Sequence, residues 1–492
     1  SDKLTQAYIA SQMEMLGLQP GGDNGSYLQA FPMVSTTVDP SISLTFKSKG
    51  KSIELRNRAE FVGVAGRQQE RVEIRDAELV FVGYGIEAPE QDWDDYKNVD
   101  VKGKILLFMN NDPAGDDPAF FGGNARTYYG RWTYKYEIAA AKGAAGAIVI
   151  HTDESAGYGW NVVENSWSRE RFALANDPAG PSTLFNGWTT SAATEKILSL
   201  SGHSLDELMK SGESKSFTPV PLGITMSTVV KTTIKTATSA NVIGVLPGSD
   251  PVLKNEAVVF TAHHDHLGIT APVNGDSINN GAMDNATGVS ALLNIAAMFI
   301  SLDEKPKRSI VFAAVGAEES GTLGSEHYVL NPLFPMSKTA ANINIDGMNV
   351  LGKTGDVIMI GYGKSNIDKI LEDVAGWQKR IVKPDQFPEQ GAFYRSDQFN
   401  FAKAGVPCMY LRAGLDYIGK PPEFAQEKVR EYVRTRYHQP SDEITPDWDL
   451  SGAVEDIQLT FLVGHDIANR KEAPRWNAGD EFETARLKSL GE

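Results

Sequence analysis

One stretch of the chain joins an apolar run to a cluster of side chains that can bind a metal: Ala257-Val258-Val259-Phe260-Thr261-Ala262-His263-His264-Asp265-His266-Leu267-Gly268. Short continuous runs of β-branched and aromatic residues are typical of a central strand that is covered on both faces. His263 supplies an imidazole ligand, and Asp265 supplies a carboxylate that could orient this imidazole. The stretch therefore predicts a buried strand with a metal ligand at its end.

Four later segments each carry a carboxylate or a histidine at a strand end or in a turn: Gly281-Ala282-Met283-Asp284-Asn285, Val315-Gly316-Ala317-Glu318-Glu319, Ile343-Asn344-Ile345-Asp346 and Tyr437-His438-Gln439. Each signal is weak to moderate alone, because an aspartate before a helix is also a common N-cap and paired glutamates are usually solvated. Adjacent glutamates point in different directions, so one of them can bind a metal while the other stays free. Asp346 is more informative, because it directly follows an apolar strand.

Strands and helices alternate from about Val229 onward, with predicted strands at 309–315, 341–346 and 357–360. This alternation predicts an α/β fold with a mostly parallel central sheet and helices on both faces. In such sheets ligands bind at the carboxyl ends of the strands. Most of the polar clusters fall at those ends, so we expect their side chains to meet.

The length of 492 residues is too great for one ordinary core, so we expect two domains. Residues 77–222 form a predicted α+β module, which leaves 1–76 and 223–492 as a discontinuous second domain. With 41% hydrophobic and 22% charged residues, the composition is that of a soluble globular protein. The formal charge of −16 disfavours nucleic acid and anionic membranes as partners.

Cys408 is the only cysteine, so an intrachain disulfide is excluded, and we expect a buried, inert thiol. No apolar run reaches the roughly 18 residues that a membrane span needs. The chain opens at Ser1 without a methionine or a signal segment, which suggests a trimmed chain or a mature protein, with any targeting peptide removed. We therefore expect a periplasmic or secreted protein, with the cytoplasm as the alternative, and the sequence leaves the oligomeric state open.

In order, residue type and placement, the five segments resemble the zinc exopeptidase family of di-zinc aminopeptidases, glutamate carboxypeptidase and the non-catalytic transferrin receptor. The resemblance covers most of the chain. It implies the zinc exopeptidase fold, which is phosphorylase/hydrolase-like. The 77–222 module resembles the protease-associated domain that some members carry as an insertion.

The resemblance also implies a role for each residue. His263 and Asp346 would bind one zinc ion, Glu319 and His438 a second, and Asp284 would bridge the two. The donor types agree, because carboxylates and imidazoles are suitable zinc ligands.

Three further residues receive catalytic roles from the same resemblance. Glu318 would be the general base, and Asp265 would accept a hydrogen bond from the far nitrogen of His263. Tyr437 would donate to the oxyanion, although it could equally be a packing residue. The family often has a cis peptide after the bridging ligand, so we expect one at Asp284–Asn285.

Other residues near these motifs receive weaker assignments. His264 and His266 flank the strand end and are expected to pack or to support ligands rather than to bind metal. Many relatives have histidine where this chain has Gln398, which weakens any assignment of subsites in the segment 393–399.

The sequence thus predicts a co-catalytic zinc aminopeptidase that acts on peptide substrates. One alternative on the same scaffold is a carboxypeptidase or dipeptidase, which would grip the substrate carboxylate through arginine, with Arg126, Arg131 and Arg395 as candidates. A more remote alternative is a non-catalytic binding or receptor module.

Overall fold

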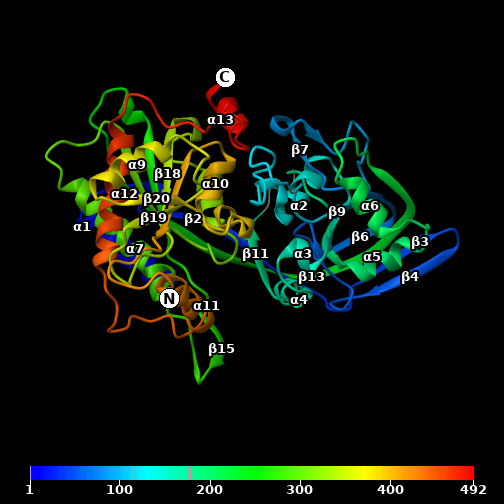
Figure 1. Ribbon diagram of the computed structural model, residues 1–492. Coiled ribbons are helices and arrows are strands. Elements are labelled where there is room, and N and C mark those ends of the chain that lie inside the picture. The colour runs from blue at the N-terminus through cyan, green and yellow to red at the C-terminus, as the bar shows by residue number, and fades with distance from the viewer. Residues whose placement is uncertain (1, 114, 176–179) are drawn as a thin grey trace. The chain divides into compact units, whose positions relative to one another are not determined.

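The structure is a computed structural model that describes residues 2–113, 115–175 and 180–492 (Figure 1). The chain divides into two compact units. Unit 1 comprises Ser1–Pro32, Thr238–Gln386 and Ala392–Glu492, and unit 2 comprises Met33–Ala237 and Phe387–Gly391. Separate apolar cores stabilise the two units.

Unit 1 is built on a mostly parallel sheet, which confirms the predicted fold class. The strand β14 (Ala257–His263) lies between β17 (Ser309–Val315) and β18 (Thr339–Asn344) and is parallel to both. β18 is also parallel to β21 (Cys408–Ala413). The sheet continues through β19 (Asp356–Ile360), which is antiparallel to β21, and β20 (Ile381–Pro384), which is parallel to β19. On the other side, the end of β13 (Val220–Leu246) runs antiparallel to β17 and to the short β1 (Gln19–Pro20).

Helices cover both faces of this sheet. On one face, side chains of four helices share a core with Phe260 of β14 and Ile343 of β18: α1 (Asp2–Met15), α7 (Thr287–Ile300), α9 (Ile367–Trp377) and α12 (Ser451–Asn469). On the other face, α10 (Gln398–Lys403) packs against β18, β21 and α8 (Leu323–Leu330), and Gln398 accepts a hydrogen bond from Asn344. Unit 1 also contains α11 (Phe424–Thr435), α13 (Glu483–Leu490) and the hairpin β15 (Ile269–Val273) and β16 (Asp276–Ile278).

Among the described residues, one helical stretch, Ala282–Ile300, is long and apolar enough to cross a membrane by length and composition alone. Here α7 packs against β14, β17 and α12. Side chains of α7 such as Leu292 and Ile295 are fully buried in the unit 1 core. The stretch is therefore accounted for as a core helix.

Unit 2 is an α+β body with a mixed sheet. Its parallel part joins β6 (Arg71–Phe81), β9 (Ile105–Met109), β10 (Gly146–His151) and β12 (Phe185–Thr190). Its antiparallel part adds β5 (Phe61–Ala65) beside β12, the first half of β13 beside β6, and the hairpin β3 (Ser43–Ser48) and β4 (Lys51–Arg56). Unit 2 also contains α2 (Trp132–Ala141), α3 (Asp153–Ala156), α4 (Trp160–Trp167), α5 (Ser191–Leu198), α6 (Leu205–Gly212), β7 (Glu87–Ala88), β8 (Trp93–Asp94) and β11 (Arg171–Leu174). The strand β2 (Leu28–Val38) begins in unit 1 and ends in unit 2.

The predicted insert 77–222 lies within unit 2, which begins earlier, at Met33, and continues beyond it to Ala237. The unit is wider because β3 hydrogen-bonds to β13, and β13 in turn pairs with β6. These hydrogen bonds join residues that are far apart in the sequence. They attach the β3–β4 hairpin, which precedes residue 77, to the predicted module. Its assignment as a protease-associated domain stays a prediction.

Candidate metal centre

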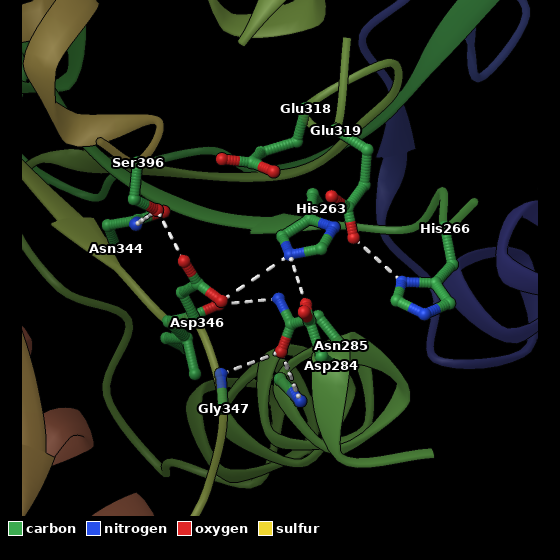
Figure 2. A network of polar contacts seen from close by, with 12 residues as sticks. His263, His266, Asp284, Asn285, Glu318, Glu319, Asn344, Asp346, Gly347 and Ser396 are labelled. Carbon is green, nitrogen blue, oxygen red and sulfur yellow. Dashed lines mark hydrogen bonds and ion pairs between the residues drawn. The ribbon is translucent and has the colours of Figure 1, made fainter. Parts of the chain in front are cut away.

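The predicted ligands converge at the carboxyl edge of the unit 1 sheet, and Figure 2 shows all of them except His438. His263 is the last residue of β14, Glu319 lies in the turn after β17, and Asp346 lies two residues beyond the end of β18. Because these three strands are parallel, their carboxyl ends meet at the same edge. Asp284 joins them from the segment just before α7, and His438 from the turn after α11.

Asp284 lies between two pairs of potential ligands. Its Oδ1 atom is 3.1 Å from Nε2 of His263, which is itself 3.4 Å from Oδ1 of Asp346. Its Oδ2 atom is 3.4 Å from Nε2 of His438, which is 3.2 Å from Oε2 of Glu319. The structure thus brings all five predicted ligands together. One oxygen of Asp284 faces His263, and the other faces His438.

The spacing and chemistry of this donor set fit divalent cations. Ligand atoms of a tetrahedral zinc ion, at about 2.0–2.1 Å from the metal, are separated from each other by about 3.3 Å. The four distances around Asp284, from 3.1 to 3.4 Å, match that separation. Within the described ranges, the ion pairs of Asp284, Glu319 and Asp346 are made with histidines alone, so no lysine or arginine neutralises these carboxylates directly.

The electrostatics of the site separate Glu318 from the ligands. Burial raises the pKa of Glu318 well above its usual range, and the negative charges of Asp397 and Asp346 act in the same direction. Burial would also raise the pKa of Asp284, but the contacts with His263 and His438 outweigh it and hold that pKa below its usual range. The pKa of Glu318 is thus shifted upward, whereas the pKa of Asp284 is shifted downward.

Asp265 supports the site differently from the prediction. Nδ1 of His263 is 3.1 Å from the main-chain oxygen of Asp265 and 3.9 Å from its carboxylate. The carboxylate instead accepts hydrogen bonds from the main-chain N–H groups of Glu318 and Glu319, at 2.9 and 3.2 Å. Asp265 thus orients the histidine through its backbone and the glutamate turn through its side chain.

Residues 241–462, which include all five predicted ligands, match the family model for Peptidase family M28. This segment is therefore similar to Peptidase family M28, and we call residues 241–462 the M28 segment. Leupeptin-inactivating enzyme 1 of Streptomyces exfoliatus is 30% identical over 193 residues, which are 38% of this chain and 40% of that protein. Aminopeptidase YwaD of Bacillus subtilis (strain 168) is 27% identical over 209 residues, which are 42% of this chain and 40% of that protein. The matches thus span about two-fifths of the length of these relatives.

A solved structure, an aminopeptidase from Aneurinibacillus sp. strain AM-1, is 20% identical to this chain and has a TM-score of 0.45. The similarity covers 95% of this chain and 89% of that one.

Three anchoring residues of the M28 segment were not predicted from the sequence. Ser396 donates a hydrogen bond of 2.7 Å to Oδ2 of Asp346. The Asn285 side chain donates to the carbonyl of Ile345 and accepts from the N–H of Gly347, so it joins the start of α7 to the loop after β18. Asp442, four residues after His438, accepts hydrogen bonds from the N–H groups of Met283 and Asp284. The sequence signal that could have identified Asp442 as a supporting residue is its position in the same turn as His438.

Three further predictions concern the peptide bond after Asp284 and the side chains of His264 and Tyr437. The peptide bond Asp284–Asn285 is cis, as predicted. His264 points to the Ala240 carbonyl, with Nε2 at 3.0 Å, and therefore takes no part in the ligand set. The Tyr437 ring stacks on the His438 ring, with centroids 3.9 Å apart, and partial burial together with nearby carboxylates raises its pKa to about 12. Its predicted catalytic role stays a prediction.

Proposed function

We propose that this chain is a zinc-dependent aminopeptidase that binds two zinc ions and hydrolyses the N-terminal peptide bond of peptides. The observation that carries the proposal is the position of Asp284, whose two oxygens each face a different imidazole. Such a shared carboxylate is suited to two cations about 3.5–4 Å apart, the spacing found in two-metal hydrolases. The M28 segment and the aminopeptidase name of one relative support the same activity.

The residues of the site would hold the metals as follows. His263 and Asp346 would bind one zinc ion, Glu319 and His438 the other, and Asp284 both. Bound zinc supplies Lewis-acid polarisation of the scissile carbonyl and lowers the pKa of water. Ser396, Asp265 and Asp442 would keep the ligands in place, since each hydrogen-bonds to a ligand side chain or to ligand backbone.

Glu318 would act as the general base and acid. Its carboxylate lies beside the ligand cluster in Figure 2 and has no hydrogen-bond partner in the part of the chain that the structure describes. Its raised pKa favours proton uptake. It would accept a proton from the attacking water and pass it to the leaving amine, with direct attack by water and no acyl-enzyme.

The proposal is tested with matched peptides that differ only at their ends. We expect the zinc-loaded protein to cleave a free-amine peptide and to leave its N-acetylated counterpart intact, whether or not the C-terminus is amidated. Faster cleavage of the N-acetylated peptide with a free C-terminus would contradict the proposal and favour a carboxypeptidase. Far fewer than two zinc ions per chain, with no cleavage of either peptide, would instead indicate a non-catalytic module.

A further inference from the structure

His266 makes a contact in the metal centre that differs from the ligand contacts. Its Nδ1 atom is 2.7 Å from Oε1 of Glu319, while Oε2 of Glu319 lies 3.2 Å from Nε2 of His438. Figure 2 shows the His266 ring beside Glu319, on the far side of the cluster from Asp346. One carboxylate therefore has a histidine on each of its oxygens.

Two readings of this contact are chemically sound. His266, Asp284 and Glu319 offer atoms that lie within 4.8 Å of one another, so His266 could itself bind the second cation. However, 2.7 Å is a hydrogen-bond distance and is shorter than the roughly 3.3 Å between two ligand atoms of a tetrahedral zinc ion. The distance therefore favours a hydrogen bond from His266 to Glu319.

The surroundings of the ring favour the same reading. Nε2 of His266 is buried and has no hydrogen-bond partner among the described residues. A neutral imidazole with its proton on Nδ1 leaves Nε2 as a bare lone pair, which needs no acceptor. That tautomer donates to Glu319 and has no free lone pair on Nδ1 for a metal. The ring also lines a cavity of about 550 Å³ between α1 and α7.

We propose that His266 is a positioning residue that fixes Glu319 through Oε1 and leaves Oε2 to bind the second metal. The inference rests on the proposed two-metal function. Ser396 does the same at the first metal, because it donates to Oδ2 of Asp346 and leaves Oδ1 facing His263. Each metal would thus have one carboxylate held on its outer oxygen by a hydrogen-bond donor.

The test measures zinc affinity rather than activity. Metal-free protein is titrated with zinc against a chromophoric chelator, and each binding step is assigned with Asp346→Ala, which removes a ligand of the first site alone. We expect His266→Ala to weaken the second site about 10- to 100-fold and to leave the first unchanged. Ser396→Ala should show the opposite pattern. His266→Asn should restore most of the affinity, because its amide places a donor near the position of Nδ1.

Each other outcome has a distinct meaning. His264→Ala is the control for loss of an imidazole in the same segment, since His264 does not contact Glu319. If His266→Ala leaves both steps unchanged, or weakens both steps equally, the positioning role is wrong. If His266→Asn fails to restore affinity and zinc-edge X-ray absorption shows fewer imidazoles per zinc in His266→Ala than in the wild type, His266 is a ligand. Fewer than two zinc ions on the wild type would instead overturn the proposed function.

Discussion

At the residue scale, the candidate site contains two adjacent glutamates with different surroundings. Glu319 faces His266 and His438, whereas Glu318 has a carboxylate without such partners and a raised pKa. Ala317, the residue before them, has a φ of 56°, a left-handed conformation that non-glycine residues adopt rarely and that is common at functional sites. The carboxylate of Asp265 holds this turn through the two following N–H groups.

Glu318→Gln separates proton transfer from metal binding. The substitution keeps the size and polarity of the side chain but removes its basic oxygen, so we expect two zinc ions per chain and a fall in kcat of about 10²- to 10⁴-fold. Elemental analysis and steady-state kinetics on a free-amine peptide check the two quantities together. Activity within a few-fold of the wild type would remove Glu318 from the base role.

The sequence could predict that these side chains would meet, because their positions follow from the fold. His263 and Asp346 end or follow buried strands that the apolar pattern identifies, and parallel strands bring such ends together. The supporting hydrogen bonds were not predictable in this way. The main-chain role of Asp265 and the contact of His266 depend on loop conformations, such as that of Ala317, which hydrophobic periodicity does not report.

At the element scale, α12 packs closely against the parallel sheet of unit 1. Phe260 of β14 lies in an aromatic group with Phe299 and Phe312, and Gly464 of α12 faces this ring. A Cβ atom at Gly464 would lie 2.3 Å from Cζ of Phe260. The missing side chain therefore allows α12 to pack closely against the strand that carries His263.

Gly464→Ala should destabilise the protein by about 1–3 kcal/mol, because the added methyl group overpacks the core. Gly376→Ala in α9 is the matched control, since nothing lies within 4 Å of its added Cβ. That change should be neutral or should stabilise by up to about 1 kcal/mol, because alanine favours a helix more than glycine. Urea unfolding of both variants measures the difference, and equal midpoints would contradict the packing account.

At the scale of the whole molecule, all five predicted ligands and Glu318 belong to unit 1, while unit 2 has its own cores and a buried lysine. The wider boundary of unit 2 was not predictable, because the pairing of β3 with β13 joins residues far apart in the sequence. In unit 2, Lys135 is fully buried, and its Nζ donates to the carbonyls of Tyr84, Asn111 and Tyr129, each at 2.8 Å. Burial lowers the pKa of Lys135 to about 7.

Lys135 should make the stability of the protein depend on pH. An unfolded lysine has a pKa of about 10.4, so between pH 7 and 10 the unfolded state holds one more proton than the folded state, and stability rises by about 1.4 kcal/mol per pH unit. Lys135→Met removes this rise and destabilises the protein, because the carbonyls around Nζ lose a hydrogen-bond donor. Urea unfolding of unit 2 from pH 7.5 to 9.5 compares the slopes, and parallel curves for the two proteins would contradict the prediction. Zinc stoichiometry should not change, since every ligand lies in unit 1.

The most direct test of the two-metal centre is anomalous diffraction at the zinc edge from crystals of the zinc-loaded protein. We predict two peaks, one among His263, Asp346 and Oδ1 of Asp284, and one among Glu319, His438 and Oδ2 of Asp284. A single peak, or two peaks of which only one touches Asp284, would contradict the account.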